Sequence, residues 1–148
     1  MTALLERDDD GTAIVEFVWL ALILMVPLLY VVLAAFDTQR EAYAASAAAR
    51  SAGRAFVTAP DQATGYARAR EAVRLAYRDQ RLEQMPELTL SCRPDPGECL
   101  TPGSVVHAEV HSSVTLPLMP AFLGSSTPSI RVDSEHDAPY GTFREARP

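Results

Sequence analysis

The chain has 148 residues, a formal net charge of −6 at pH 7 and no lysine among its thirteen basic residues. This length gives room for one small domain beside a membrane segment, and the acidic balance gives no support to a role in binding nucleic acid. No Gly-rich phosphate loop or nucleophile elbow occurs. The residue types of a catalytic triad are present in His111, Ser112, Ser113 and Asp133, but no sequence motif of a triad enzyme accompanies them. We therefore expect neither enzymatic activity nor a cofactor.

A run of twenty residues from Phe17 to Phe36 contains no charged side chain. A helix of this length rises about 30 Å, the thickness of the hydrocarbon core of a bilayer. A core helix buried within the domain is the weaker alternative, because a small domain could hardly bury a helix that is apolar on every side. The run predicts one membrane-spanning helix, with a kink or a loosened turn at Pro27, which has no backbone N–H to donate.

The residues that follow the run keep a helical character. The segment 37–55 is rich in alanine and free of proline, which predicts that the helix leaves the membrane as a stalk. Small side chains would let neighbouring helices approach closely, and the residues expected to do this are Ala34, Ala35, Ala44, Ala45, Ala47 and Ala48. The predicted organisation is a transmembrane helix and stalk at 12–58, followed by an exported domain at 59–148.

A cleaved secretory signal is an alternative explanation of the same run. Ala42 and Ala44 provide the small residues that a signal peptidase needs, but the apolar core is longer than usual and the residues before it are acidic. The arginines alone would place the C-terminus inside the cell, because one precedes the run and Arg40, Arg50 and Arg54 follow it. The opposite orientation is favoured by the cysteine pair and by the motif described below.

Two cysteines, Cys92 and Cys99, are separated by six residues that include two prolines and a glycine. This spacing is neither that of a CxxC redox motif nor that of a four-ligand zinc site. A short disulfide loop is the simplest use of the pair, and it requires an oxidising compartment such as the one outside the cytoplasmic membrane. Two free thiols in a reduced protein are the alternative.

A glutamate stands at the head of the apolar run, in the sequence Gly11-Thr12-Ala13-Ile14-Val15-Glu16-Phe17. A lone carboxylate near hydrocarbon is costly to bury, although Glu16 taken alone could mark the aqueous end of the helix. A glycine with a glutamate five residues later, leading into about twenty apolar residues, resembles the processing signal of type IV prepilins. More closely, residues 11–56 resemble the N-terminal region of TadE-like proteins, the minor pseudopilins of tight-adherence (Flp-type) pilus systems. The shared features are the Gly-x-x-x-x-Glu-Phe start, a proline within the apolar helix and an Ala/Arg-rich continuation.

The resemblance implies a processing step. A prepilin peptidase would cut between Gly11 and Thr12 on the cytoplasmic side, which would remove residues 1–11 as a leader and leave the helix in the membrane. The new α-amine of Thr12 would then pair with Glu16 of the same or a neighbouring subunit and offset the cost of holding the carboxylate in lipid. The implied partners are the prepilin peptidase, other pilins and pseudopilins, the Tad assembly platform proteins and the lipid bilayer.

Two alternatives to the pilus interpretation stay open. Leaders of this family usually carry basic residues before the glycine, whereas this chain has Asp8, Asp9 and Asp10. An uncleaved single-span protein whose exported domain binds a partner is the first alternative. The second is a secreted binding protein that begins near Ala45.

A second helix is expected from about Asp61, which would cap it, to about Gln84. Its apolar stripe would consist of Tyr66, Ala69, Val73, Ala76 and Tyr77. The remaining surface is crowded with five arginines among acidic residues: Arg68, Arg70, Arg74, Arg78 and Arg81 beside Glu71, Asp79 and Glu83. This surface is either simply solvated or faces anionic lipid headgroups or an acidic patch on a neighbouring pilus subunit.

The pattern then changes to period two, which is typical of strands. Leu88 and Leu90 begin a first strand, and the clearest strand runs from about Ser104 to Leu116. One face of it should pack, with Val106, Ala108, Val110, Val114 and Leu116, and the other should meet water, with His107, Glu109, His111, Ser113 and Thr115. The two histidines and Glu109 suggest a metal site, but an exposed polar face explains them equally well.

The proline, glycine and serine residues near the end of the chain predict a loop at 117–128. Its apolar residues either pack at the edge of the core or contact the bilayer or a partner. A last strand begins at Ile130 and Val132, and residues 144–148 are expected to be a frayed tail. Residues 129–145 also resemble the closing strand and tail of TadE-like proteins. The predicted fold class is therefore α+β: a long N-terminal transmembrane and stalk helix, a second helix and a small antiparallel sheet.

Overall fold

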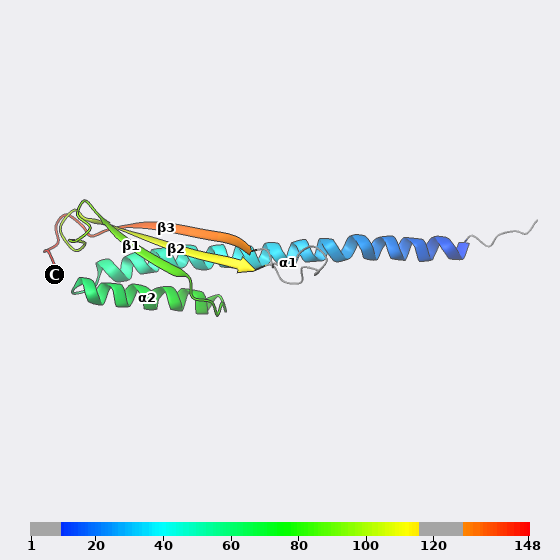
Figure 1. Ribbon diagram of the computed structural model, residues 1–148, viewed down its shortest axis with the longest axis horizontal. Helices are drawn as coiled ribbons and strands as arrows, with labels where there is room; N and C mark the ends of the chain where they lie inside the picture. Colours follow the sequence, from blue (N-terminus) through cyan, green and yellow to red (C-terminus); the bar gives the residue numbers. More distant parts are fainter. Residues whose placement is uncertain (1–9, 116–128) are drawn as a thin grey trace, which may run out of the picture. The chain divides into compact units, whose positions relative to one another are not determined.

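The computed structural model of the protein describes the backbone of residues 10–115 and 129–148, and the side chains of the same ranges from residue 13 onward. The segments 1–9 and 116–128 lie outside the described residues, and with them most of the predicted leader, the predicted core residue Leu116 and the whole predicted loop at 117–128. Two helices and three strands follow in the order α1 (Asp10–Val57), α2 (Gln62–Asp79), β1 (Glu87–Arg93), β2 (Val105–Thr115) and β3 (Ser129–Pro139) (Figure 1). The predicted α+β class is confirmed.

The chain divides into two units at residues 36 and 37. The first unit contains the apolar part of α1. The second, from Asp37 to the C-terminus, contains the rest of α1 together with α2 and the sheet. The compact domain thus begins at Asp37, about twenty residues before the boundary expected from the sequence.

The sheet is antiparallel with the strand order β1-β2-β3. Its register aligns Leu90 with Ala108 and Ala108 with His136. The predicted alternation along the central strand is confirmed over the described residues: Val106, Ala108, Val110 and Val114 are buried, whereas His107, Glu109 and His111 lie on the other face and are partly exposed. One face of the sheet therefore packs into the domain and the other meets solvent.

The inner face of the sheet is covered by the helices of the same unit. The core contains side chains from α1 (Ala44, Ala45, Ala48, Ala49, Ala52 and Phe56), from α2 (Ala69, Val73 and Tyr77) and from the sheet (Val106, Ala108, Val110 and Ala138). The three- and four-residue steps between these core residues place them on one side of α1. The arrangement is a two-layer α/β sandwich with a single core.

The alanine-rich part of α1 is therefore a core helix rather than a free stalk. Ala44, Ala45 and Ala48 are fully buried inside the chain's own domain, so they are not available for packing against helices of other subunits. Small side chains have another use here, since they let the helix backbone approach the sheet. At Gly53 the approach is close: a Cβ atom added there would lie 2.9 Å from the Cβ of Ala138.

The second helix begins as predicted and ends earlier than predicted. The carboxylate of Asp61 accepts a hydrogen bond from the backbone N–H of Thr64 at 2.8 Å, which is a standard N-cap. At the other end the N–H of Leu82 donates to the carbonyl of Tyr77 and the N–H of Arg81 to that of Arg78. This pair of bonds defines a Schellman motif, and Arg81, with φ of 57°, occupies the left-handed position that usually belongs to glycine. The helix thus stops at Asp79 rather than near Gln84.

The C-terminal residues are fixed to the domain and are not a frayed tail. The guanidinium of Arg144 donates to the carbonyl oxygen of Val57 at 2.9 Å, and that of Arg147 donates to the carbonyl oxygen of Ala59 at 2.8 Å. The last carbonyls of a helix have no partner within it, so Arg144 satisfies the final carbonyl of α1, whereas Arg147 bonds to the turn that follows the helix. Arg144 also lies over the ring of Tyr140, 4.5 Å from its centre.

Candidate anchor and interaction surfaces

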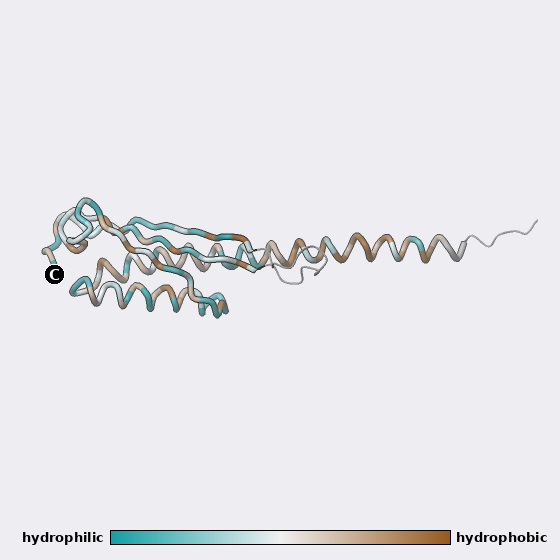
Figure 2. The backbone as a smooth tube through the Cα atoms, in the orientation of Figure 1, coloured by the Kyte–Doolittle hydropathy of each residue, from teal (hydrophilic) through white to brown (hydrophobic). Residues whose placement is uncertain are grey.

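The first part of α1 is long and apolar enough to cross a membrane, by length and composition. Figure 2 shows its residues as a nearly continuous hydrophobic stretch. Its large apolar side chains are exposed within their own unit, with Phe17 71% and Ile23 69% accessible. Exposed apolar side chains on every side of a helix are unfavourable in water and suit contact with lipid.

The residues of the predicted processing signal lie at the start of this helix. The backbone of Gly11 and Thr12 is helical, the side chain of Thr12 lies outside the described residues, and the side chain of Glu16 is exposed. The pairing of Thr12 with Glu16 therefore stays a prediction. The helix is continuous through Pro27, whose missing N–H leaves the carbonyl of Ile23 without its usual helical donor.

Cys92 and Cys99 form a disulfide, as the sequence predicts, with their Cα atoms 5.3 Å apart. The bridge is buried, whereas the six residues that it encloses are exposed. The hydroxyl of Ser104 donates to the carbonyl oxygen of Cys99 at 2.5 Å, and Leu100 is fully buried. The bridge closes a loop that joins β1 to β2. Loop-closure entropy for so short a loop gives it a stabilising contribution of about 2–3 kcal/mol.

A buried carboxylate that the sequence analysis missed lies at the beginning of the domain. Glu41 of α1 is 1% exposed, and the hydroxyl of Ser112 on β2 donates a hydrogen bond to its carboxylate. A buried carboxylate needs such a partner, because its desolvation is otherwise uncompensated. The sequence did contain a signal: Glu41 precedes Ala44, Ala48 and Ala52 by helical steps and so shares their face.

The ring of Tyr77 on α2 completes this cluster. Its hydroxyl is buried and has no hydrogen-bond partner of acceptable geometry among the described residues. Burial raises the pKa of Tyr77 to about 12, and the charge of Glu41 acts in the same direction. The tyrosine therefore stays neutral. Glu41 of α1, Ser112 of β2 and Tyr77 of α2 together form one buried cluster.

The outer face of the sheet carries the two histidines that had suggested a metal site. Nδ1 of His107 lies 2.6 Å from a carboxylate oxygen of Asp137, and Nδ1 of His111 lies 3.0 Å from one of Asp133. Both carboxylates belong to β3, opposite the histidines in the register. Among the described residues no group of three or more His, Cys, Asp or Glu side chains is arranged to hold a metal ion. The histidines act here as partners of carboxylates.

Ser112 does not form a catalytic triad with His111 and Asp133. That serine lies on the inner side of β2 and its hydroxyl bonds to Glu41, whereas His111 lies on the outer side with Asp133. The second ring nitrogen of His111 lies 3.4 Å from a carboxylate oxygen of Glu109. His111 is therefore paired with carboxylates on the outer face, on the opposite side of the sheet from Ser112.

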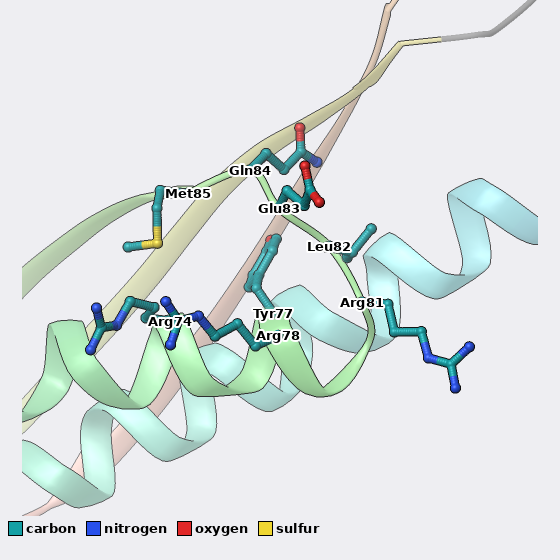
Figure 3. A pocket seen from close by; sticks show the side chains of 8 residues that line it. All are labelled: Arg74, Tyr77, Arg78, Arg81, Leu82, Glu83, Gln84 and Met85. Carbon is teal, nitrogen blue, oxygen red and sulfur yellow. The ribbon is translucent and has the colours of Figure 1, made fainter.

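A cavity of about 390 Å³ lies where α2 ends and the chain turns toward β1 (Figure 3). Three of the predicted surface arginines line it: Arg74, Arg78 and Arg81. Arg74 is already paired with Glu71 at 2.6 Å, and Glu83 also lines the cavity. The negative end of the helix dipole lies there as well, so the arginines are largely balanced locally and the cavity is a weak site for an anion.

Comparison with family models, curated proteins and solved structures gives no match for this chain.

The Ser112 bond to Glu41 should contribute measurably to stability. Changing Ser112→Ala leaves a buried carboxylate without this donor, and we expect the free energy of unfolding to fall by about 2 kcal/mol. Chemical denaturation of the full chain in detergent micelles, followed by circular dichroism, measures the loss. Ser113→Ala is the matched control, because Ser113 is exposed on the same strand and should lose less than about 0.5 kcal/mol. Equal losses for the two variants would show that the bond to Glu41 is not stabilising.

The His111–Asp133 pair predicts a pH dependence. The hydrogen bond to Asp133, with the charges of Glu109, Asp133 and Glu87, raises the pKa of His111 above its ordinary value. A raised pKa in the folded state means that the pair stabilises the fold fully below the unfolded-state pKa, and that this stabilisation is lost as the pH rises through the folded-state value. Asp133→Asn should lower the pKa of His111 in an NMR titration of its ring protons. Asp137→Asn, which removes the partner of His107, should leave the pKa of His111 almost unchanged. Equal changes in the pKa of His111 in the two variants would contradict the pairing of His111 with Asp133.

Proposed function

We propose that this protein is a TadE-like pseudopilin, a membrane-inserted structural subunit for the assembly or initiation of a tight-adherence pilus. The observation that carries the proposal is the spacing of Gly11 and Glu16 at the head of an apolar helix of membrane length. In this proposal the N-terminus is cytoplasmic, the first part of α1 crosses the membrane, and the domain from Asp37 onward is outside the cytoplasm.

The disulfide supports the proposed orientation. A bridge between Cys92 and Cys99 persists in oxidising compartments and is reduced in most cytoplasms. It therefore favours a domain outside the cytoplasm, against the orientation that the arginines alone would give.

The packing of α1 supports retention of the anchor. A secreted product beginning near Ala45 would lack Glu41 and Ala44, both of which are buried in the domain core. Cleavage at that point would remove the carboxylate that bonds to Ser112 and open the end of the core. A cut after Gly11 leaves all of these residues in place.

The proposed role of Glu16 is electrostatic. Cleavage after Gly11 would create an α-amine on Thr12 within about one helical turn of Glu16, and a cation there offsets the cost of a carboxylate in lipid. Pairing with the same subunit or with a neighbour would set the depth and register of the helices.

Intact-mass analysis of the membrane-extracted protein tests the proposal. We expect Thr12 to be the first residue, and a Gly11→Leu variant to keep residues 1–11. In the processed protein Glu16→Ala should reduce incorporation into pili or their assembly complexes, whereas Glu16→Asp, which keeps the charge, should retain most of it. A functional protein that still begins at Met1 would contradict the proposal and favour an uncleaved anchored protein; a soluble product beginning near Ala45 would favour a secreted one.

A further inference from the structure

The outer face of the sheet is an acidic surface, which we call the sheet face. It consists of the outward side chains of three strands: Glu87 and Arg93 of β1, His107, Glu109 and His111 of β2, and Arg131, Asp133, Glu135 and Asp137 of β3. Five carboxylates face two arginines here, a formal charge of −3 with neutral histidines. None of the described residues covers this face, as the exposure of its carboxylates shows.

Part of this charge is unbalanced within the face itself. Glu109 and Glu135 stand directly opposite each other in the register of β2 and β3. Like charges in opposite positions of a sheet destabilise the pair. The nearest basic groups are His111, 3.4 Å from Glu109, and His107, 3.7 Å from Glu135, and each of these histidines is also bonded to an aspartate of β3. A positive partner on this face would relieve the repulsion.

The other layer of the domain carries the opposite charge. Residues 42–57 of α1 and the whole of α2 have six arginines, Arg50, Arg54, Arg68, Arg70, Arg74 and Arg78, and two acids, Glu71 and Asp79. This gives the helix layer, which we call the helix face, a formal charge of +4. The arginines are exposed or half-exposed, because the buried stripe of α2 is made of Gly65, Ala69, Val73 and Tyr77. The two layers of one small domain thus present surfaces of opposite sign.

This distribution determines which kind of self-association is favourable. Two sheet faces repel each other, and so do two helix faces, so a twofold dimer made from either face is disfavoured. The sheet face of one copy and the helix face of the next attract each other. Such a contact is heterologous: each added copy leaves one face of each sign free, which permits a ring or an open row.

We propose that the partner of the sheet face is the helix face of a second copy of this chain. The inference deepens the proposed function, on which it rests, by naming the contact between the exported domains of neighbouring subunits. Anchoring in one membrane would hold the domains side by side at high effective concentration, so a modest electrostatic contact suffices.

Cross-linking of single-cysteine variants tests which faces meet. The two native cysteines are bridged, so an introduced cysteine supplies the free thiol. Thr89→Cys marks the sheet face, beside Glu109 in the register. Ala67→Cys marks the helix face, on the side of α2 opposite Gly65 and Ala69. The two full-length variants, with different tags, are mixed in the same nanodiscs or vesicles and treated with a short bismaleimide.

The expected product is the mixed dimer, in a yield at least about tenfold above that of either homodimer. Its yield should fall when the salt concentration is raised from 50 mM to 500 mM, because screening weakens the contact. Homodimers in equal or greater yield, or no cross-link, would overturn the proposal. The intact mass of the same samples reports processing after Gly11 independently, so failure of this contact is distinguished from failure of the pilin assignment.

Charge-reversed variants separate electrostatic attraction from chance collision. Glu135→Arg in the Thr89→Cys protein, or Arg70→Glu in the Ala67→Cys protein, should each lower the mixed yield by about tenfold, and combining the two should restore most of it. Glu98→Arg, on an exposed loop outside both faces, changes the net charge equally and should have little effect. Equal losses for Glu135→Arg and Glu98→Arg would refute a specific contact. Circular dichroism of each variant confirms that it is folded.

Discussion

The burial of one side of α1 against the sheet is the interaction on which the rest of this structure depends. The helix that carries the apolar segment continues into the domain and there supplies Ala44, Ala45, Ala48, Ala52 and Phe56 to the core. Alanine contributes little apolar area, so the packing gains from short distances rather than from large side chains. The close approach at Gly53 shows how little space remains between α1 and the sheet.

This packing connects the other features. Because α1 and α2 occupy the inner face of the sheet, the outer face is left to charged residues and the domain acquires layers of opposite sign. Glu41 fixes the start of the core helix through Ser112, and Arg144 satisfies its last carbonyl, that of Val57. The disulfide closes the loop between β1 and β2. A small domain with few large apolar residues in its core gains stability from each of these contacts.

The sequence predicted the features that depend on local pattern. The alternation along β2, the cap at Asp61 and the bridge between Cys92 and Cys99 all follow from neighbouring residues, and all are present. The role of residues 37–57 was missed because alanine occupies both sides of the helix. Ala42 is exposed and Ala44 is buried, so hydropathy gives no contrast between the two sides.

Other features depend on pairings between distant residues and could not be read from local pattern. His107 meets Asp137 and His111 meets Asp133 only because of the register between β2 and β3. The end of α2 was misplaced because an arginine occupies the left-handed position where a glycine would have marked the stop. The processing signal at Gly11 and Glu16 is local in sequence, but its function involves a peptidase and other subunits, and it stays a prediction.

Accessibility of matched alanine-to-cysteine variants along α1 tests the central claim that one helix serves both as membrane anchor and as core helix. The full-length chain in bilayers would be treated with a water-soluble maleimide, with the cysteine at position 21, 42 or 45. We expect Ala42→Cys to react, Ala45→Cys to react only after denaturation, and Ala21→Cys to react only after the bilayer is dissolved. Equal reactivity of Ala42→Cys and Ala45→Cys would indicate a free stalk and contradict the core assignment. Reaction of Ala21→Cys in intact bilayers would contradict membrane insertion.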